Sequence, residues 1–79
     1  MMKGGKNLNT VVVPNIRRII NERGLKQYAV AERAGYTKQQ FNAMLTGRKL
    51  ITDIDICKIT SALNVDANTL FMARKEGNP

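Results

Sequence analysis

The side chains best suited to chemistry lie between positions 38 and 46, and the chemistry available to them is hydrogen bonding. This stretch combines a lysine with amide, hydroxyl and methyl groups: Lys38, Gln39, Gln40, Asn42, Ala43 and Thr46. A glutamine can pair bidentately with adenine, a lysine can donate to guanine, and an alanine can meet the methyl group of thymine. The same residue types are also ordinary on a helix surface, so their meaning depends on the elements that position them.

The chain lacks the residue sets needed for covalent or metal chemistry. It has no histidine and one cysteine, Cys57, which excludes imidazole catalysis, a histidine-ligated metal and a disulfide framework. Asp53 and Asp55 are two positions apart and fall on different helix faces. We therefore expect no enzyme activity, no cofactor and no metal site, and we expect Cys57 to be buried in the core.

Positive charge is concentrated in the first two thirds of the chain. The 79 residues hold 13 Lys and Arg against six acids, a net charge of +7. Residues 1–50 carry ten of the bases and two acids, hence +8, whereas residues 51–79 carry three bases and four acids, hence −1. This much charge on a small domain favours a polyanionic partner, which the first fifty residues would attract.

Apolar spacing and capping residues predict an all-α domain of five helices. The expected limits are about 14–23, about 26–34, Thr37 to Gly47, Thr52 onward and Asp66 onward. Pro14 suits the first position of a helix, and we expect residues 11–13 to form an extended lead-in. The expected organisation is a flexible basic arm over 1–9, a domain over 10–73 and a frayed tail over 74–79.

The buried stripes follow helical spacing, and the second and third helices are joined by a very short turn. The expected core residues are Ile16, Ile19, Ile20, Phe41, Met44, Leu45, Ile54, Ile59, Ala62 and Leu63. The turn consists only of Gly35, Tyr36 and Thr37, and so short a connection holds two helices at a steep angle. Gly35 is expected at positive φ, and Ala31 must be small because the helices cross there.

Seven residues between positions 27 and 44 share an order and spacing with a known motif: Gln27, Val30, Ala31, Ala34, Gly35, Phe41 and Met44. With them, the chain resembles the helix-turn-helix of the phage repressor/Cro-like family, also called the XRE family. The run 61–66, followed by Leu70 and Phe71, is similar to the junction of that family's fourth and fifth helices. The resemblance covers roughly residues 14–72.

The resemblance implies a five-helix lambda-repressor-like domain whose third helix reads base edges in the major groove of duplex DNA. Carried over by position, the base contacts are Lys38, Gln39, Gln40 and Ala43. Gln40 also forms a capping box with Thr37, which competes for its side chain. Phosphate contacts are expected from the flanks of the motif, at Lys26, Gln27, Thr37, Asn42, Thr46, Arg48 and Lys49.

Several residues beside the motif have two open interpretations. Arg17 and Arg18 either extend the phosphate-binding patch or take no part in it. Lys3 and Lys6 either follow a groove or do nothing. Tyr36 either offers its hydroxyl to a phosphate or packs.

The chain departs from the family at two places. Lys26 stands where many members have a capping Ser, Thr or Asn, a loss that typically costs about 1 kcal/mol. Ile20 and Leu45 stand where the best-studied phage members bury an Arg–Glu pair. Because packed apolar residues can replace a buried ion pair at little cost, this paired change is compatible with DNA binding.

The resemblance implies a sequence-specific transcriptional regulator, and we expect a repressor of phage, mobile-element or bacterial origin in the cytoplasm, associated with the nucleoid. Members usually act as homodimers on DNA, and the expected dimer surface is Leu70, Phe71 and Met72. Two alternatives remain. One is an antitoxin or another module that binds a protein partner, and the other is a structural module with a vestigial motif.

Overall fold

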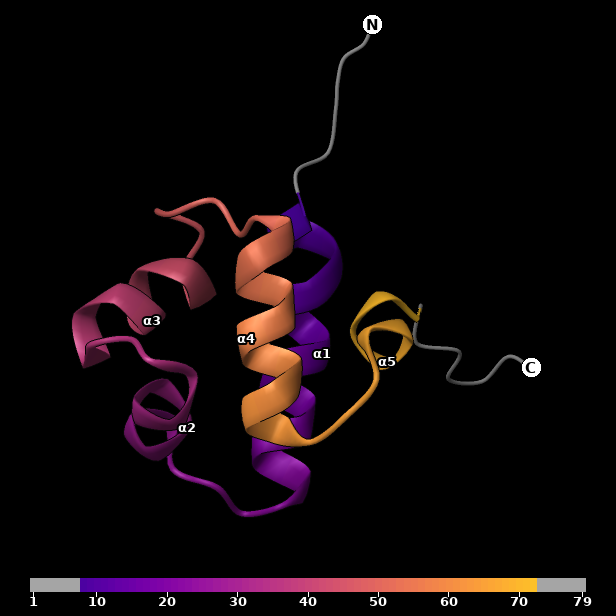
Figure 1. Cartoon of the computed structure of the whole chain (residues 1–79), viewed down its shortest axis with the longest axis horizontal. Helices are drawn as coiled ribbons and strands as arrows, with labels where there is room; N and C mark the ends of the chain where they lie inside the picture. The colour runs from indigo at the N-terminus through magenta and orange to yellow at the C-terminus, as the bar shows by residue number, and fades with distance from the viewer. Residues whose placement is uncertain (1–7, 73–79) are drawn as a thin grey trace, which may run out of the picture.

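The computed structural model describes residues 8–72 as five α-helices, with no strand in that range. The helices are α1 (Leu8–Glu22), α2 (Gln27–Ala34), α3 (Lys38–Leu45), α4 (Asp53–Leu63) and α5 (Ala67–Phe71). In the view of Figure 1, α2 and α3 lie on one side of α4, and α5 lies on the other. Helix α2 packs on α3 and α4, and α1 packs on α3 and α5. The expected all-α, five-helix class is confirmed.

Helix α1 begins earlier than the sequence suggested. It starts at Leu8, so residues 11–13 are helical rather than extended, and Pro14 lies inside the helix rather than at its first position. The reason is packing, because Val12, Ile16 and Ile19 form one buried stripe that continues through the proline. Of the expected arm, residues 8 and 9 are therefore helical; residues 1–7 and the expected tail lie outside the described range.

The predicted helix ends at the motif are confirmed. Gly35 caps α2 at φ 88°, in the left-handed region where a side chain would be strained. Thr37 and Gln40 form a complete capping box at the start of α3, and Thr52 and Asp55 form another at the start of α4. Lys26 occupies the N-cap position of α2 without a side-chain cap, as predicted.

One hydrophobic core joins all five helices. Its fully buried side chains are Val12, Ile16, Phe41, Met44, Ile59, Leu63 and Leu70. Ala31 is 1% exposed, in keeping with the predicted need for a small residue at the crossing. Leu45 is buried and Ile20 packs against the core, so apolar packing occupies both positions of the family's ion pair.

One core prediction on α4 is affected by which face of that helix is buried. Its interior stripe is Ile56, Ile59 and Leu63, at helical spacing. Ile54 precedes that stripe by two positions and is 67% exposed, so the prediction that it is buried is wrong.

Within residues 8–72, none of the helices has the length and hydrophobicity that a membrane span requires.

Three arginines hold the C-terminal ends of helices. Arg17 donates to the carbonyl of Leu45 at the end of α3, at 3.1 Å. Arg23 and Arg33 donate to the carbonyls of Leu63 and Ala62 at the end of α4, at 2.5 and 3.3 Å. A positive charge at a helix C-terminus satisfies carbonyls that lack an intrahelical partner and complements the helix dipole. Part of the positive charge counted in residues 1–50 therefore also supports the fold.

Candidate nucleic-acid interface

Helix α3 is buried on one face and carries the expected contact residues on the other. Phe41, Met44 and Leu45 are buried, and their i, i+3, i+4 spacing fixes which side faces the core. The expected base-contact residues Lys38, Gln39 and Gln40 are exposed, and Ala43 is half-buried. The structure thus brings the predicted base contacts together on one short projecting helix.

The starts of α2 and α3 meet around a small pocket. Its volume is about 230 Å³, and it is lined by Lys26, Gln27, Tyr28 and Lys38. Gln27 Nε2 also donates to Asn42 Oδ1 at 3.4 Å, so this face of α3 touches the first turn of α2. Tyr28 is 55% exposed here, and the sequence reasoning did not count it among the contacts. In the sequence, Tyr28 directly follows the expected phosphate contact Gln27, and this position could have marked it as a candidate contact.

The polar groups of α3 differ in what they can still offer to DNA. Gln40 Oε1 accepts from the N–H of Thr37, while its amide protons take no part in that cap. The Thr37 oxygen accepts from the N–H of Gln40, and its own proton takes no part in that bond. The Thr46 hydroxyl donates to the carbonyl of Asn42 at 2.9 Å. It would have to break this bond before it could donate to a phosphate.

The loop after α3 carries the exposed side chains of Arg48 and Lys49. Gly47, at φ 85°, turns the chain away from the helix axis. The N–H groups of Arg48 and Lys49 then both donate to the carbonyl of Ala43, at 2.8 and 3.1 Å. The backbone beneath the two basic side chains is therefore fixed against the end of α3.

Tyr36 packs within the protein, which decides between the two interpretations of its role. Its ring stacks on Phe41 with 6.2 Å between centroids, and Lys58 Nζ lies 5.2 Å from its ring centre. Its hydroxyl donates to Asp55 Oδ1 at 2.5 Å. The turn of the motif is thereby tied to the start of α4, and the tyrosine proton is used inside the protein.

This bond shifts the pKa values of both partners. Burial, followed by the hydrogen bond to Asp55, raises the pKa of Tyr36 far above its usual value. Burial alone would raise the pKa of Asp55, but hydrogen bonds from Tyr36 and Thr52, with the charge of Lys49, lower it. The pair therefore prefers a neutral tyrosine beside an ionised aspartate.

Tyr36→Phe is expected to reduce the free energy of unfolding by about 1.5–3 kcal/mol near neutral pH, because it removes a bond to a charged group. Since the pKa of Asp55 is lowered by folding, its contribution is present above the unfolded value of about 3.9 and is lost at lower pH. Since the pKa of Tyr36 is raised, its contribution is lost only as pH rises past about 10.

Urea unfolding of the wild type and Tyr36→Phe across pH tests this pairing. The difference between the two proteins should stay constant from about pH 5 to about pH 9 and shrink below about pH 4. A difference that is unchanged at about pH 3 would show that the ionised carboxylate of Asp55 is not the partner.

The arginines beside the motif are engaged within the protein. Arg17 holds the end of α3, as described above, and Arg18 lies 3.7 Å from Glu22 and donates to Asn15. These bonds do not favour the interpretation that they extend the phosphate-binding patch. Lys3 and Lys6 lie outside the described residues.

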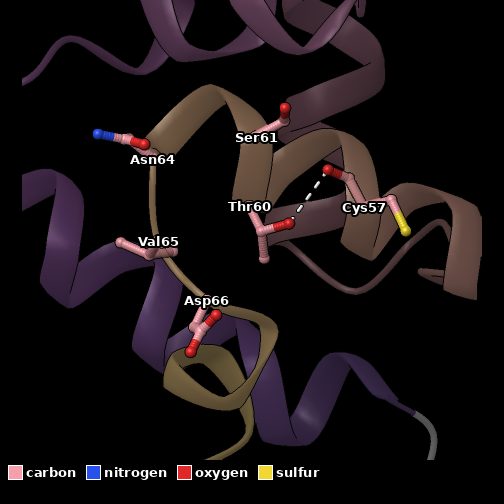
Figure 2. Close-up of a pocket in the computed structure, with 6 residues that line it drawn as sticks. All are labelled: Cys57, Thr60, Ser61, Asn64, Val65 and Asp66. Carbon is pink, nitrogen blue, oxygen red and sulfur yellow. Dashed lines mark hydrogen bonds between the residues drawn. The ribbon is translucent and has the colours of Figure 1, made fainter.

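A wider hollow of about 580 Å³ lies on the C-terminal half of α4 and its junction with α5 (Figure 2). Its lining residues are Cys57, Thr60, Ser61, Asn64, Val65 and Asp66. Cys57 is exposed, so the prediction that it is buried is wrong; it follows Ile56 directly and so turns away from the core. None of the lining residues belongs to α2 or α3, so this hollow is separate from the candidate interface.

The fold and the projecting face of α3 together define a DNA-binding helix-turn-helix domain. The family model described as helix-turn-helix matches residues 16–70. The chain belongs to this family, the XRE-type helix-turn-helix proteins, as its resemblance to the motif predicted.

Solved structures show the same architecture. A hypothetical transcription factor from Neisseria, NHTF, is 27% identical with a TM-score of 0.78, covering 89% of this chain and 80% of that one. The restriction-modification controller protein C.AhdI from Aeromonas hydrophila is 21% identical with a TM-score of 0.73, covering 80% and 96%. The clp gene regulator ClgR from C. glutamicum is 15% identical with a TM-score of 0.74, covering 84% and 86%. No curated protein sequence matches the chain.

Proposed function

We propose that the protein is a sequence-specific regulator of transcription that binds duplex DNA and acts as a repressor by occupying a promoter. The observation that carries this proposal is that α3 has one buried and one exposed face. Phe41, Met44 and Leu45 anchor the buried face in the core, and the exposed face presents amides and a lysine. The chain has no histidine, and the proposed action requires binding alone, without catalysis.

The proposed base contacts are Lys38, Gln39, Gln40 and Ala43, with α3 in the major groove. Gln39 is a suitable partner for adenine and Lys38 for guanine, and the Ala43 methyl suits thymine. Gln40 would act through its amide protons, because its oxygen caps α3. The pocket beside these contacts lies at the starts of α2 and α3. The backbone N–H groups and the dipole at a helix start favour an anion.

The proposed phosphate contacts flank α3 on both sides. Lys26 and Gln27 lie at the start of α2, and Thr37, Asn42 and Thr46 lie on or beside α3. Arg48 and Lys49 follow its end and supply full positive charges. Phosphate contacts position a protein on the duplex, while base contacts determine the sequence it prefers.

We further propose that the protein binds as a homodimer, with half-sites about one helical turn, roughly 34 Å, apart. The exposed apolar residues Phe71 and Met72, at 42% and 60% exposure, support the expected surface at the end of α5. Leu70 is fully buried, so it belongs to the core rather than to that surface. We also propose that this regulator has a phage, mobile-element or bacterial origin.

The proposal is tested by selecting bound duplexes from a random library with the full chain. We expect one short sequence to be enriched, and binding to it to weaken with salt because phosphate contacts release counterions. Six phosphate contacts give a log–log slope near −5. Retention of no duplex would reject the proposal, and a separate pull-down from the source cell that captures a specific protein partner would favour the antitoxin-like alternative.

A further inference from the structure

A buried asparagine at the start of α1 binds the loop that follows α3. The Asn9 side chain is 5% exposed. Its Nδ2 donates to the carbonyl of Met44 at 2.9 Å and to that of Lys49 at 2.8 Å, and its Oδ1 accepts from the N–H of Ile51 at 2.9 Å. One side chain thus joins the last turn of α3 to the loop at Lys49 and at Ile51.

The backbone of Arg48 and Lys49 is consequently held from two directions. Their N–H groups bond to the carbonyl of Ala43 on one side, and Asn9 binds the Lys49 carbonyl on the other. The two side chains are exposed. The loop can therefore present both charges in one arrangement before any partner binds, which reduces the ordering cost of binding.

We propose that Asn9 is a positioning residue for DNA binding, which holds the loop so that Arg48 and Lys49 reach the phosphates. This inference rests on the proposed function. Because Asn9 is buried, it acts through the loop and not by touching DNA. Without its amide, the Lys49 carbonyl and the Ile51 N–H lose this partner, while the Met44 carbonyl keeps its bond from the N–H of Gly47. Backbone groups are costly to leave unpaired, so the loop would move to hydrate them.

The chain contains a matched control on the same helix. Asn15 is also buried, at 3% exposure, and its Nδ2 donates to the carbonyls of Leu70 and Met72 at 2.6 and 2.9 Å. It holds the end of α5 in the way that Asn9 holds the end of α3. Replacing either residue removes a buried amide from α1, but only Asn9 is bonded to the loop with the two basic residues.

The test compares the full-length wild type, Asn9→Ala, Asn15→Ala and the double variant Arg48→Ala/Lys49→Ala on the selected duplex across a range of salt. Loss of two phosphate contacts should reduce the log–log slope by about 1.8 per bound protomer. We expect Asn9→Ala to show this reduction. Asn15 bonds to Met72 at the proposed dimer surface, so Asn15→Ala can weaken binding through dimerisation, but its slope per bound protomer should stay at the wild-type value. Added to the double variant, Asn9→Ala should change the affinity by less than about threefold, since coupled residues are not additive.

A folded Asn9→Ala protein with the wild-type slope would overturn the inference, as would a full, additive loss when the three substitutions are combined. If Asn9→Ala does not fold, Asn9→Ser gives the same test, because the shorter hydroxyl cannot bridge the three groups; a wild-type slope in this variant would also overturn the inference. Failure of the wild type itself to bind any duplex would instead reject the proposed function.

Discussion

Phe41→Ala is expected to reduce the free energy of unfolding by about 3–5 kcal/mol, the usual cost of truncating a buried phenylalanine. The Phe41 side chain is fully buried, lies on the inner face of α3 and stacks on Tyr36. A domain of this length has a total stability of roughly 4–12 kcal/mol. Removing the ring should therefore leave much of the protein unfolded at moderate temperature and detach α3 from the core.

Urea denaturation followed by circular dichroism measures this loss, and Gln39→Ala on the exposed face of the same helix is the control. Surface substitutions usually change stability by less than about 0.5 kcal/mol, so Gln39→Ala should unfold at the wild-type midpoint. A loss of less than about 1 kcal/mol for Phe41→Ala would contradict the placement of its ring in the centre of the core.

Arg48→Ala/Lys49→Ala is expected to cause a large loss of DNA affinity without a comparable loss of stability. Both side chains are exposed, so their removal leaves the core intact. If each phosphate contact contributes about 1 kcal/mol, the pair is worth about 30-fold in affinity per protomer. The log–log slope should fall by about 1.8 per protomer at the same time.

A salt titration of this double variant beside Lys58→Ala separates contact from general charge. Lys58 lies on α4 with its ammonium over the Tyr36 ring and is not among the proposed contacts. Its removal should leave the slope within about half a unit of the wild type, since the slope counts the phosphates that a protein neutralises and Lys58 is not proposed to contact one. Equal slopes for the wild type and the double variant would exclude the loop from the phosphate contacts.

Local signals in the sequence were enough to predict most helix ends at the motif. The capping boxes of Thr37 and Thr52 each depend on a partner three residues away, and the end of α2 depends on Gly35 alone. Such features are determined by neighbouring residues, so they can be read without tertiary structure.

Features that depend on distant partners could not be predicted in this way. Asn9 stands in a stretch rich in glycine, lysine and asparagine, and its partners lie 35 to 42 positions away. The early start of α1 depends on burial of Val12 against the core, which outweighs the helix-breaking tendency of Pro14. Tyr36 was left open for the same reason, because Asp55 is 19 positions away.

The concentration of positive charge before residue 51 has more than one cause. Arg17, Arg23 and Arg33 bond to carbonyls at helix ends. By contrast, Lys26 and Lys38 line the pocket between α2 and α3, and Arg48 and Lys49 are exposed on the loop. All these charges attract a polyanion at long range, but the second group carries the proposed close contacts.

The central claim, that α3 reads base pairs, is tested most directly by the discrimination of Gln39→Ala between duplexes. Affinities of the wild type and this variant would be measured for the selected sequence and for duplexes changed at one base pair at a time. A bidentate contact is worth about 1–3 kcal/mol of discrimination. We therefore expect Gln39→Ala to lose roughly 5- to 150-fold preference at one position of each half-site, with the other positions and the salt slope unchanged. Unchanged discrimination at every position would contradict the assignment of base reading to Gln39 on α3.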